Sequence, residues 1–266
     1  MKVNSNKITG VLNVTSSAQQ FDLRRYYPPK ELQCLIEQFW FVDWDIPPGH
    51  SHTQENLPDP NFHLVIDQNQ AKVIAPVSKK YVYTMTGKAG IIGVKFNAGA
   101  LFHLLEIEPS EILNTELFVD ALFDFSATQL VNALSVCDND EQRVNTLTQY
   151  LLPVAKKPSN SLVKMQQLLG LIKQSTDIYS VDELSTRAGM SIRSIQRLFK
   201  QYLGFSPKWL IRKYRLHHAL ELIVTGELNV NDLIYLLNYS DQSHLINDFK
   251  SFTGTTPSQY MTKLNT

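Results

Sequence analysis

Hydrophobic and polar positions alternate over short runs in the first third of the chain, a pattern typical of β-strands. The runs are rich in aromatic and β-branched residues and are separated by Pro, Gly, Asn and Lys, as strands and their turns usually are. The strands that this pattern predicts are FWFVDW (39–44), FHLVID (62–67), AKVIAP (71–76), YVYTMT (81–86) and IIGVKF (91–96).

From residue 98 onward the apolar residues recur at helical spacing, which indicates amphipathic helices. The predicted helices are AGALFHLLEI (98–107), SATQLVNALSV (126–136) and DEQRVNTLTQYLL (140–152). A run of strands followed by helices is typical of an α+β domain with an antiparallel sheet. We therefore expect an α+β N-terminal domain over residues 1–155.

The segment PVAKKPSNS (153–161) combines prolines, lysines and small polar residues between two helical patterns, which predicts a linker. Beyond this segment, every stretch has the spacing of a helix or the composition of a tight turn. We expect a second, all-α domain over residues 160–266.

This second domain contains an internal repeat. FKQYLGFSP begins at Phe199 and FKSFTGTTP begins at Phe249, so that Phe, Lys, Gly and Pro recur at a fixed offset. Upstream, SVDELSTRAGMS (180–191) aligns with NVNDLIYLLNYS (229–240), with one extra residue in the second copy. Two copies are too few for a solenoid, so each copy should be a compact helical unit.

The first copy has the signals of a helix, a tight turn and a second helix. Ser180 and Glu183 form a capping box, Gly189 suits a left-handed turn, and Ser191 can cap the helix that follows. This order is typical of a helix-turn-helix unit. Opposite the apolar stripe of the second helix lie Arg193, Ser194, Gln196, Arg197 and Lys200.

These polar side chains have the chemistry of major-groove recognition. Arg pairs bidentately with guanine and Gln with adenine. A solvated helix face is the alternative, and the repeat argues against it. The second copy again turns polar side chains away from Leu245 and Phe249.

The stretch SPKWLIRKYRLHHALELIVTG (206–226) between the copies predicts one long helix, capped by Ser206 and ended by Gly226. Its Arg212, Lys213 and Arg215 suit either phosphate contacts or plain solubility. The fold class that we expect is therefore an α+β domain followed by two helix-turn-helix units joined by a long helix.

The C-terminal part resembles the DNA-binding domain of AraC/XylS-type bacterial transcription regulators over its full length. SVDELSTRAGMSIRSIQRLFKQYLGFSPKWL, RLHHALELI and YSDQSHLINDFKSFTGTTPSQY carry the resemblance. It implies seven helices and two recognition helices, residues 192–201 and 241–251, in successive major grooves of double-stranded DNA. The predicted DNA-binding residues are Ser191, Arg193, Ser194, Gln196, Arg197, Lys200, Ser240, Gln242, Ser243, His244, Asn247 and Lys250.

Four positions depart from the pattern of the resembled family, among them Ser185 and Ile234, which stand where Ala is usual. Asn238 stands where the second turn usually has Gly, and Asn also adopts left-handed backbone geometry. Asn247 stands where many relatives carry Arg. We expect the second unit to keep its fold and to read bases less strongly or differently.

The first domain also carries a resemblance. YYPPKELQCLIEQFWFVDW, LPDPNFHLVID and GVKFNAGALFHLLEIEPSEILN are similar to an uncharacterised domain that is found fused to AraC-type DNA-binding domains. The resemblance implies a sensing or dimerising module and names no ligand. Aromatic residues here either pack in a core or line a pocket for a small, partly apolar effector; the candidate ligand-binding residues are Tyr27, Trp40, Trp44 and His63.

Composition agrees with a cytoplasmic DNA-binding protein. Residues 1–159 hold 13 Lys and Arg against 17 Asp and Glu, whereas residues 160–266 hold 12 against 8, so the C-terminal part is mildly basic. Cys34 and Cys137 are the only cysteines, too few for a disulfide framework. The first residues lack a signal peptide and no apolar run is long enough for a membrane span, so we expect no membrane association.

The sequence gives no reason to propose catalysis, and we expect neither a cofactor nor a metal. His50, His52 and Glu55 are similar to the H-x-H…E pattern of metal-binding cupins, but Glu55 comes one residue early. Control by an effector, a homodimer or a protein partner stays open, as does activation, through RNA polymerase, or repression. The alternative is an N-terminal domain with a metal-dependent or enzymatic activity, tethered to a DNA-binding module.

Overall fold

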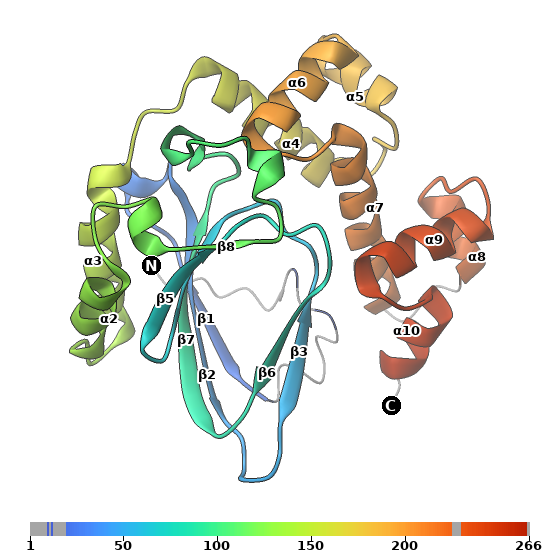
Figure 1. Ribbon diagram of the computed structural model, residues 1–266. Coiled ribbons are helices and arrows are strands. Elements are labelled where there is room, and N and C mark those ends of the chain that lie inside the picture. The colour runs from blue at the N-terminus through green and yellow to red at the C-terminus, as the bar shows by residue number, and fades with distance from the viewer. Residues whose placement is uncertain (1–9, 11, 13–19, 225–229, 265–266) are drawn as a thin grey trace.

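The computed structural model describes residues 10, 12, 20–224 and 230–264. Figure 1 shows a twisted antiparallel sheet with two helices against one side and a succession of helices that runs over its top and down its other side. The α+β domain followed by an all-α part is confirmed. Within the described ranges, no helix is both long and apolar enough to cross a membrane.

All strand pairs among the described residues of the N-terminal domain are antiparallel. Six strands form one sheet in the order β1-β2-β7-β4-β5-β8, and β3 pairs with β6 in a separate two-stranded ribbon. The strands are β1 (Asp22–Tyr26), β2 (Ile36–Asp45), β3 (His52–Asn56), β4 (His63–Asp67), β5 (Gln70–Ile74), β6 (Tyr81–Met85), β7 (Lys88–Phe96) and β8 (Glu116–Leu117).

The two faces of the large sheet have different roles because side chains alternate along each strand. Phe39 and Phe41 on β2 point into the main core, which α2 (Ala127–Ser135) and α3 (Asp140–Leu151) cover. Trp40 points to the opposite face, toward the β3–β6 ribbon. Trp40 and its two neighbours thus follow the alternation expected of a single strand.

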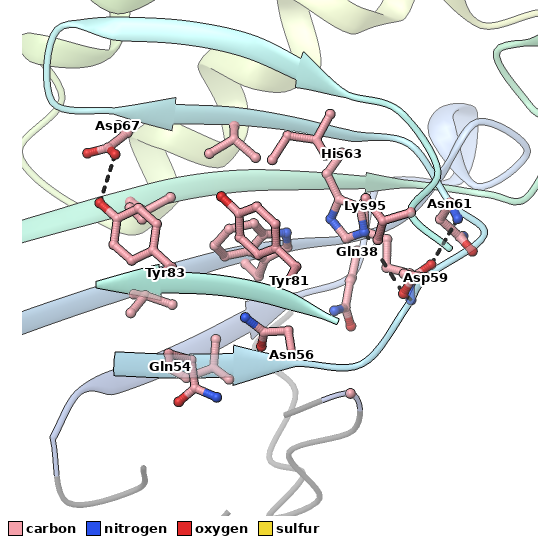
Figure 2. Close-up of a pocket in the computed structure, with 18 of the residues that line it drawn as sticks. Gln38, Gln54, Asn56, Asp59, Asn61, His63, Asp67, Tyr81, Tyr83 and Lys95 are labelled. Carbon is pink, nitrogen blue, oxygen red and sulfur yellow. Dashed lines mark hydrogen bonds and ion pairs between the residues drawn. The ribbon is translucent and has the colours of Figure 1, made fainter. Parts of the chain in front are cut away.

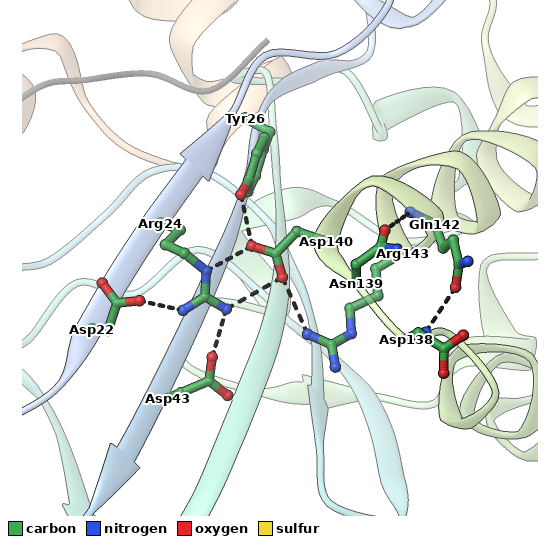
Figure 3. A network of polar contacts seen from close by, with 9 residues as sticks. All are labelled: Asp22, Arg24, Tyr26, Asp43, Asp138, Asn139, Asp140, Gln142 and Arg143. Carbon is green, nitrogen blue, oxygen red and sulfur yellow. Dashed lines mark hydrogen bonds and ion pairs between the residues drawn. The ribbon is translucent and has the colours of Figure 1, made fainter.

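A network of charges fixes α3 to the edge strand β1 (Figure 3). The Arg24 guanidinium donates to Asp140 at 2.6 Å, to Asp22 at 2.6 Å and to Asp43 at 2.5 Å. The Tyr26 hydroxyl donates to Asp140 at 2.6 Å, and Arg143 lies 3.1 Å from the same carboxylate. These bonds hold the pKa of Asp140 below its usual range against the opposing effect of burial.

The C-terminal part contains, within the described ranges, the seven helices that the resemblance implies. A first apolar core lies among α4, α5, α6 and the start of α7, and a second lies among the end of α7, α8, α9 and α10. The helices are α4 (Asn160–Gln174), α5 (Val181–Ala188), α6 (Ile192–Leu203), α7 (Pro207–Val224), α8 (Val230–Leu236), α9 (Gln242–Thr253) and α10 (Pro257–Leu264).

The prediction of a helix over residues 98–107 is wrong. Turns and a 3-10 helix, Phe102–Leu104, occupy this segment. Gly99 has a positive φ of 73° and lies against the side chains of Leu162 and Met165. A regular helix through residue 99 would not bring the backbone into this contact.

The other predicted elements of the first domain are found, with shifted ends. The sequence pattern missed β1, β3 and β8. The predicted end of the long helix at Gly226 lies outside the described residues.

The N-terminal domain and the helical part are joined by a linker and also pack against each other. Ala98 belongs to the core of the first helical unit, and Leu57 belongs to that of the second. A Cβ on Gly204, at the end of α6, would lie 2.6 Å from the backbone nitrogen of Ser110. The N-terminal domain therefore contacts both halves of the helical part.

Candidate DNA-binding surface and ligand cavity

The first helix-turn-helix unit forms as its sequence predicts. The Ser180 hydroxyl accepts a hydrogen bond from the Glu183 backbone nitrogen, and the Glu183 carboxylate accepts one from the Ser180 backbone nitrogen. These two bonds form the capping box at α5. Gly189 adopts the left-handed conformation, with φ 61°. Ser191 then caps α6 by accepting from the Ser194 backbone nitrogen.

The outer face of α6 carries long polar side chains. Arg193, Gln196, Arg197 and Lys200 are exposed, and within the described part of the chain none of them makes a side-chain hydrogen bond or ion pair. The opposite face buries Ile195, Leu198 and Phe199. Three cations and an amide are thus presented to solvent on one helix face.

The second unit repeats this architecture with different chemistry. Asn238 takes the left-handed turn conformation, with φ 52°, as its departure from Gly required. Asp241 caps α9 by accepting from the His244 backbone nitrogen at 2.8 Å. The exposed residues of the outer face are Gln242, Ser243, Asn247 and Lys250.

His244 is held within the protein. Its Nδ1 lies 3.2 Å from the Ser240 hydroxyl, and its ring packs edge-on against Tyr239 with centroids 5.1 Å apart. Its Nε2 lies 3.5 Å from an Arg215 nitrogen. Among the predicted recognition residues of α9, His244 therefore differs from its exposed neighbours, because its ring contacts Tyr239, Ser240 and Arg215.

A buried ion-pair network joins α9 to α7. Asp248 has 1% of its surface exposed and accepts from Arg212 Nε at 2.8 Å and from Arg215 at 3.0 Å. Arg215 also lies 4.0 Å from the centroid of the Tyr239 ring. Neither phosphate contact nor solubility explains Arg215 or Lys213, since both side chains are buried. Arg215 instead positions α9.

A cavity of about 250 Å³ lies in the N-terminal domain between the large sheet and the β3–β6 ribbon. Figure 2 shows Tyr81 and Tyr83 side by side on β6, with their hydroxyls directed toward β4. Trp40 forms part of the wall and lies flat across Gly93, where any Cβ would collide with its indole. Phe21, Val65, Ile74 and Met85 supply further apolar surface.

One end of the cavity holds a cluster of charges. Lys95 pairs with Asp59 at 2.9 Å and with Glu37 at 3.2 Å. Burial would raise the pKa of Asp59, but the charges of Lys95, His63 and Lys213 hold it well below its usual range. Burial lowers the pKa of His63, against the opposing effect of the Asp59 and Glu37 charges.

The charge cluster continues into the helical part of the protein. Lys213 on α7 interacts electrostatically with Asp59 and Lys95, and Lys173 on α4 interacts with the same cluster. Burial, together with the charges of Lys95 and Lys173, lowers the pKa of Lys213 to about 7. The cavity and the helix that joins the two helix-turn-helix units therefore share one electrostatic environment.

The four candidate ligand-binding residues occupy different places. Trp40 and His63 line the cavity. Tyr27 is 58% exposed, and Trp44 packs beside the cavity, where its Nε1 donates to the Thr86 carbonyl. The polar residues that line the cavity were missed in the sequence analysis. Lys95 is one of them, and its position as a single lysine within an apolar strand could have indicated it. Asp59 and Asn61, which flank Pro60 in the loop before β4, were missed as well.

His52 lies on β3, opposite Met85, and His50 lies in the loop before it. In the part of the chain that the structure describes, no group of three or more His, Cys, Asp or Glu side chains is placed to hold a metal ion.

Family models match both halves of the chain. Residues 184–263 match a helix-turn-helix domain, and residues 24–118 match a domain of unknown function (DUF6597). The second match corresponds to most of the strands that surround the cavity.

Characterised and uncharacterised relatives match the C-terminal half. The chain is 26% identical over 109 residues to the HTH-type transcriptional regulator ExsA of Pseudomonas aeruginosa, covering 41% of this chain and 39% of ExsA. It is 27% identical over 92 residues to the HTH-type transcriptional activator RhaS of Escherichia coli, covering 34% and 33%. An uncharacterized regulator of Haemophilus influenzae is 28% identical over 93 residues, covering 35% and 31%. The match thus spans about a third of each relative's length.

Solved structures that match this chain include ToxT from Vibrio cholerae, with a TM-score of 0.42 and 13% identity over 93% of this chain and 99% of ToxT. The C-terminal domain of AraT from Geobacillus stearothermophilus gives a TM-score of 0.34 and 25% identity over 41% of this chain and 88% of that domain.

Proposed function

The C-terminal part of this chain is an AraC-type helix-turn-helix domain, and from this premise we propose that the protein is a sequence-specific DNA-binding transcription regulator. A small effector, bound in the cavity of the N-terminal domain, controls how the protein binds its promoter. The protein acts by binding and not by catalysis, in the cytoplasm of a bacterium.

The exposed polar face of α6 carries the proposal. Arg193, Gln196 and Arg197 have no partner in the described part of the protein, and their donors match guanine and adenine edges in the major groove. The second unit follows at the other end of α7. A single rigid helix between the units would place their target sites about one DNA turn apart, roughly 34 Å or 10 base pairs.

Effector control is supported by the position of the cavity. Asp59 and Lys95 line it and also interact electrostatically with Lys213 on α7. A ligand that disturbs the Lys95–Asp59 pair changes the charge that surrounds Lys213. Such a change would act on α7, the helix that sets the relative positions of α6 and α9. Allosteric control needs a ligand that interacts differently with two states of the protein, and this contact would provide that difference.

Two partners complete the proposal. A homodimer formed through the N-terminal domain would place four recognition helices on DNA, and light scattering after gel filtration measures whether it exists. If the bound protein activates its promoter, RNA polymerase is the partner that it contacts.

Selection of bound fragments from genomic DNA by the full chain tests the proposal. We expect enrichment of a bipartite sequence, with binding that weakens steeply as salt increases because phosphate contacts release counterions. The variant with Arg193, Gln196 and Arg197 changed to Ala should lose this enrichment. Lys88→Ala, which removes an 82% exposed cation from the N-terminal domain, is the control and should keep it.

Fragments without a shared sequence would contradict sequence-specific regulation. Enrichment that survives the triple substitution would instead show that α6 does not read the bases. Circular dichroism of each variant shows whether its helices are intact.

A further inference from the structure

Polar atoms without hydrogen-bond partners gather around the cavity. Among buried side-chain atoms in the described part of the chain, those without a partner include Trp40 Nε1, Gln54 Oε1, Asn61 Oδ1 and Asp67 Oδ1. All four residues line the cavity. Buried polar atoms in native proteins nearly always have a partner, and a bound molecule that supplies these partners would explain the four exceptions.

The two amide oxygens are true acceptors, because their neighbours fix the orientation of each amide. Gln54 is 4% exposed, and its Nε2 donates to the carbonyls of Glu55 at 2.7 Å and Leu12 at 3.4 Å. Asn61 is 1% exposed, and its Nδ2 donates to the Phe96 carbonyl at 2.6 Å and to Glu37 at 3.1 Å. Rotating either amide would place oxygen against oxygen. Both oxygens therefore require a donor from elsewhere.

The carboxylate of Asp67 adds a third acceptor and a negative charge. Its Oδ2 accepts from the Tyr83 hydroxyl at 2.8 Å, whereas its Oδ1 has no partner (Figure 2). Two lysines of the lining are already paired, Lys95 with Asp59 and Glu37, and Lys72 with Glu116 at 2.6 Å. Most of the polar atoms without partners in this cavity are therefore acceptors, which need hydrogen-bond donors from a ligand.

The walls between these acceptors are flat and aromatic. Trp40, Tyr81 and Tyr83 line the cavity, and Phe21 contributes a further ring. The volume of about 250 Å³ exceeds the roughly 150 Å³ that holds benzene and falls below most drug-sized pockets, which begin at about 300 Å³. One or two fused rings with a short side chain fit this space.

We propose that the cavity binds a small aromatic amine, whose ring lies against Trp40 and the β6 tyrosines while its ammonium and other N–H or O–H groups donate to Asp67, Gln54 and Asn61. This inference rests on the proposed function, since it names the chemical class of the effector. Aromatic faces and a carboxylate together favour an organic cation, because both attract positive charge. Trp40 Nε1 supplies one donor for an acceptor on the ligand.

A carboxylic acid of the same shape fits less well. Its charge would meet Asp67, whose Oδ1 has no partner, and its oxygens would leave the three acceptors without donors. Arg25 also lines the cavity, so the acid must be tested directly.

Calorimetric titration of the full chain with matched molecules tests the class. One set is tyramine, tyrosol and 4-hydroxyphenylacetate; the other is tryptamine, tryptophol and indole-3-acetate. Each set keeps the ring and changes the side chain from cation to neutral alcohol to anion. We expect the amine of at least one set to bind about 10-fold or more tighter than its acid, as a charge-assisted hydrogen bond provides.

Asp67→Asn removes the charge and keeps the shape of the side chain. We expect it to weaken amine binding about 10-fold and to change alcohol binding by no more than about 3-fold. Asp45→Asn is the matched control, because Asp45 is a 71% exposed carboxylate on β2 that does not line the cavity. Its amine affinity should equal that of the unmodified protein.

Tighter binding of an acid than of its amine would overturn the proposal, as would the absence of binding by all six molecules, which is the result for a cavity that holds only water. Equal loss in Asp67→Asn and Asp45→Asn would also overturn it. Should Asp67→Asn fail to fold, the amine-to-acid ratio of the unmodified protein still decides. No DNA is present in the titration, so its failure is separate from a failure of DNA binding.

Discussion

The two helix-turn-helix units share one architecture and use their charged residues in opposite ways. In the first unit, Arg193 and Arg197 extend from α6 into solvent. In the second, Arg212 and Arg215 on α7 both bind Asp248 of α9, and Arg215 is buried while Arg212 is half-buried. The outer face of α9 has one exposed cation, Lys250, beside short uncharged side chains.

This difference shows that a repeat can conserve the apolar pattern of a unit while its polar residues change roles. The apolar stripe of each recognition helix holds the fold, so polar positions are free to diverge. Long guanidinium arms can bind bases bidentately, whereas Ser and Asn reach less far. We therefore propose that the first unit supplies most base specificity and that the second supplies mainly position and phosphate affinity.

The largest effect is expected where the second unit is anchored. Asp248→Ala leaves the buried guanidinium of Arg215 without its carboxylate, and breaking a buried pair in this way costs about 3–5 kcal/mol. We expect chemical denaturation to show this loss in the free energy of unfolding. Asp182→Ala, at an exposed position of α5, is the control and should change stability by no more than about 0.5 kcal/mol. Equal losses in both variants would mean that the network does not anchor α9.

The next effect concerns α7, which joins the two units and carries Lys213 toward the N-terminal domain. The pKa of Lys213 is about 7 in the folded protein and 10.5 is its ordinary value. Between these values the unfolded chain holds a proton that the folded chain has released. The contribution of Lys213 to stability therefore rises with pH in this window, by at most about 1.4 kcal/mol per pH unit.

Lys213→Met removes this titration. We expect the variant to gain stability over the unmodified protein near pH 6 and to lose that advantage as pH rises from about 7 toward 10. The charged and titratable groups around Lys213 are Glu37, Asp59, Lys95, Lys173, Tyr214 and His217. Lys88→Met, an exposed lysine, should show no such pH-dependent difference in unfolding experiments. A constant difference between the Lys213 variant and the unmodified protein would refute the shifted pKa.

Recognition by the two helices can be compared directly. Single changes of Arg193, Gln196 or Arg197 to Ala should each cost about 1–3 kcal/mol in binding to the selected sequence, because each removes a base contact. Gln242, Ser243 or Asn247 changed to Ala should cost less than the α6 changes. Titration of each variant against specific and scrambled DNA measures this difference. Larger losses from α9 would reverse the proposed division of roles.

The smallest effect on stability is expected for substitutions in the turn of the first unit, which we compare with the turn of the second. Gly189→Ala should cost about 1–2 kcal/mol, because a side chain in left-handed geometry is strained although a Cβ at Gly189 meets no atom within 4 Å. Gly189→Asn should cost less, since Asn238 already adopts this geometry in the second turn. Thermal unfolding measures both. If the two substitutions are equally costly, the conformational equivalence of the turns is wrong.

The local signals of the helical part could be predicted from the sequence because they act between close neighbours. The capping box of Ser180 and Glu183, the left-handed turns at Gly189 and Asn238 and the N-cap Ser191 depend on residues within one turn of each other. Helix starts and stops of this kind are set by local hydrogen bonds and backbone preferences. The exposed face of α6 follows directly from the helical spacing of its apolar residues.

Elements of the first domain that depend on distant partners were harder to predict. The strand β3, HTQEN, has no apolar alternation, and it forms because β6 pairs with all five of its residues. Residues 98–107 have helical spacing, yet contacts of Gly99 with α4 hold them in turns. Tertiary packing overrode the local preference in both cases.

The sequence by itself therefore determined the two helical units, their caps and the polar face that suits DNA, because short-range periodicity and hydrogen bonding specify them. Only the tertiary structure decided which charges are buried and which face solvent. Glu37, Asp59 and Lys95 come from separate segments and meet Lys213 only after the sheet and α7 pack together. Likewise, Arg215 is one of several basic residues in the sequence, and only the approach of α9 gives it Asp248 as a partner.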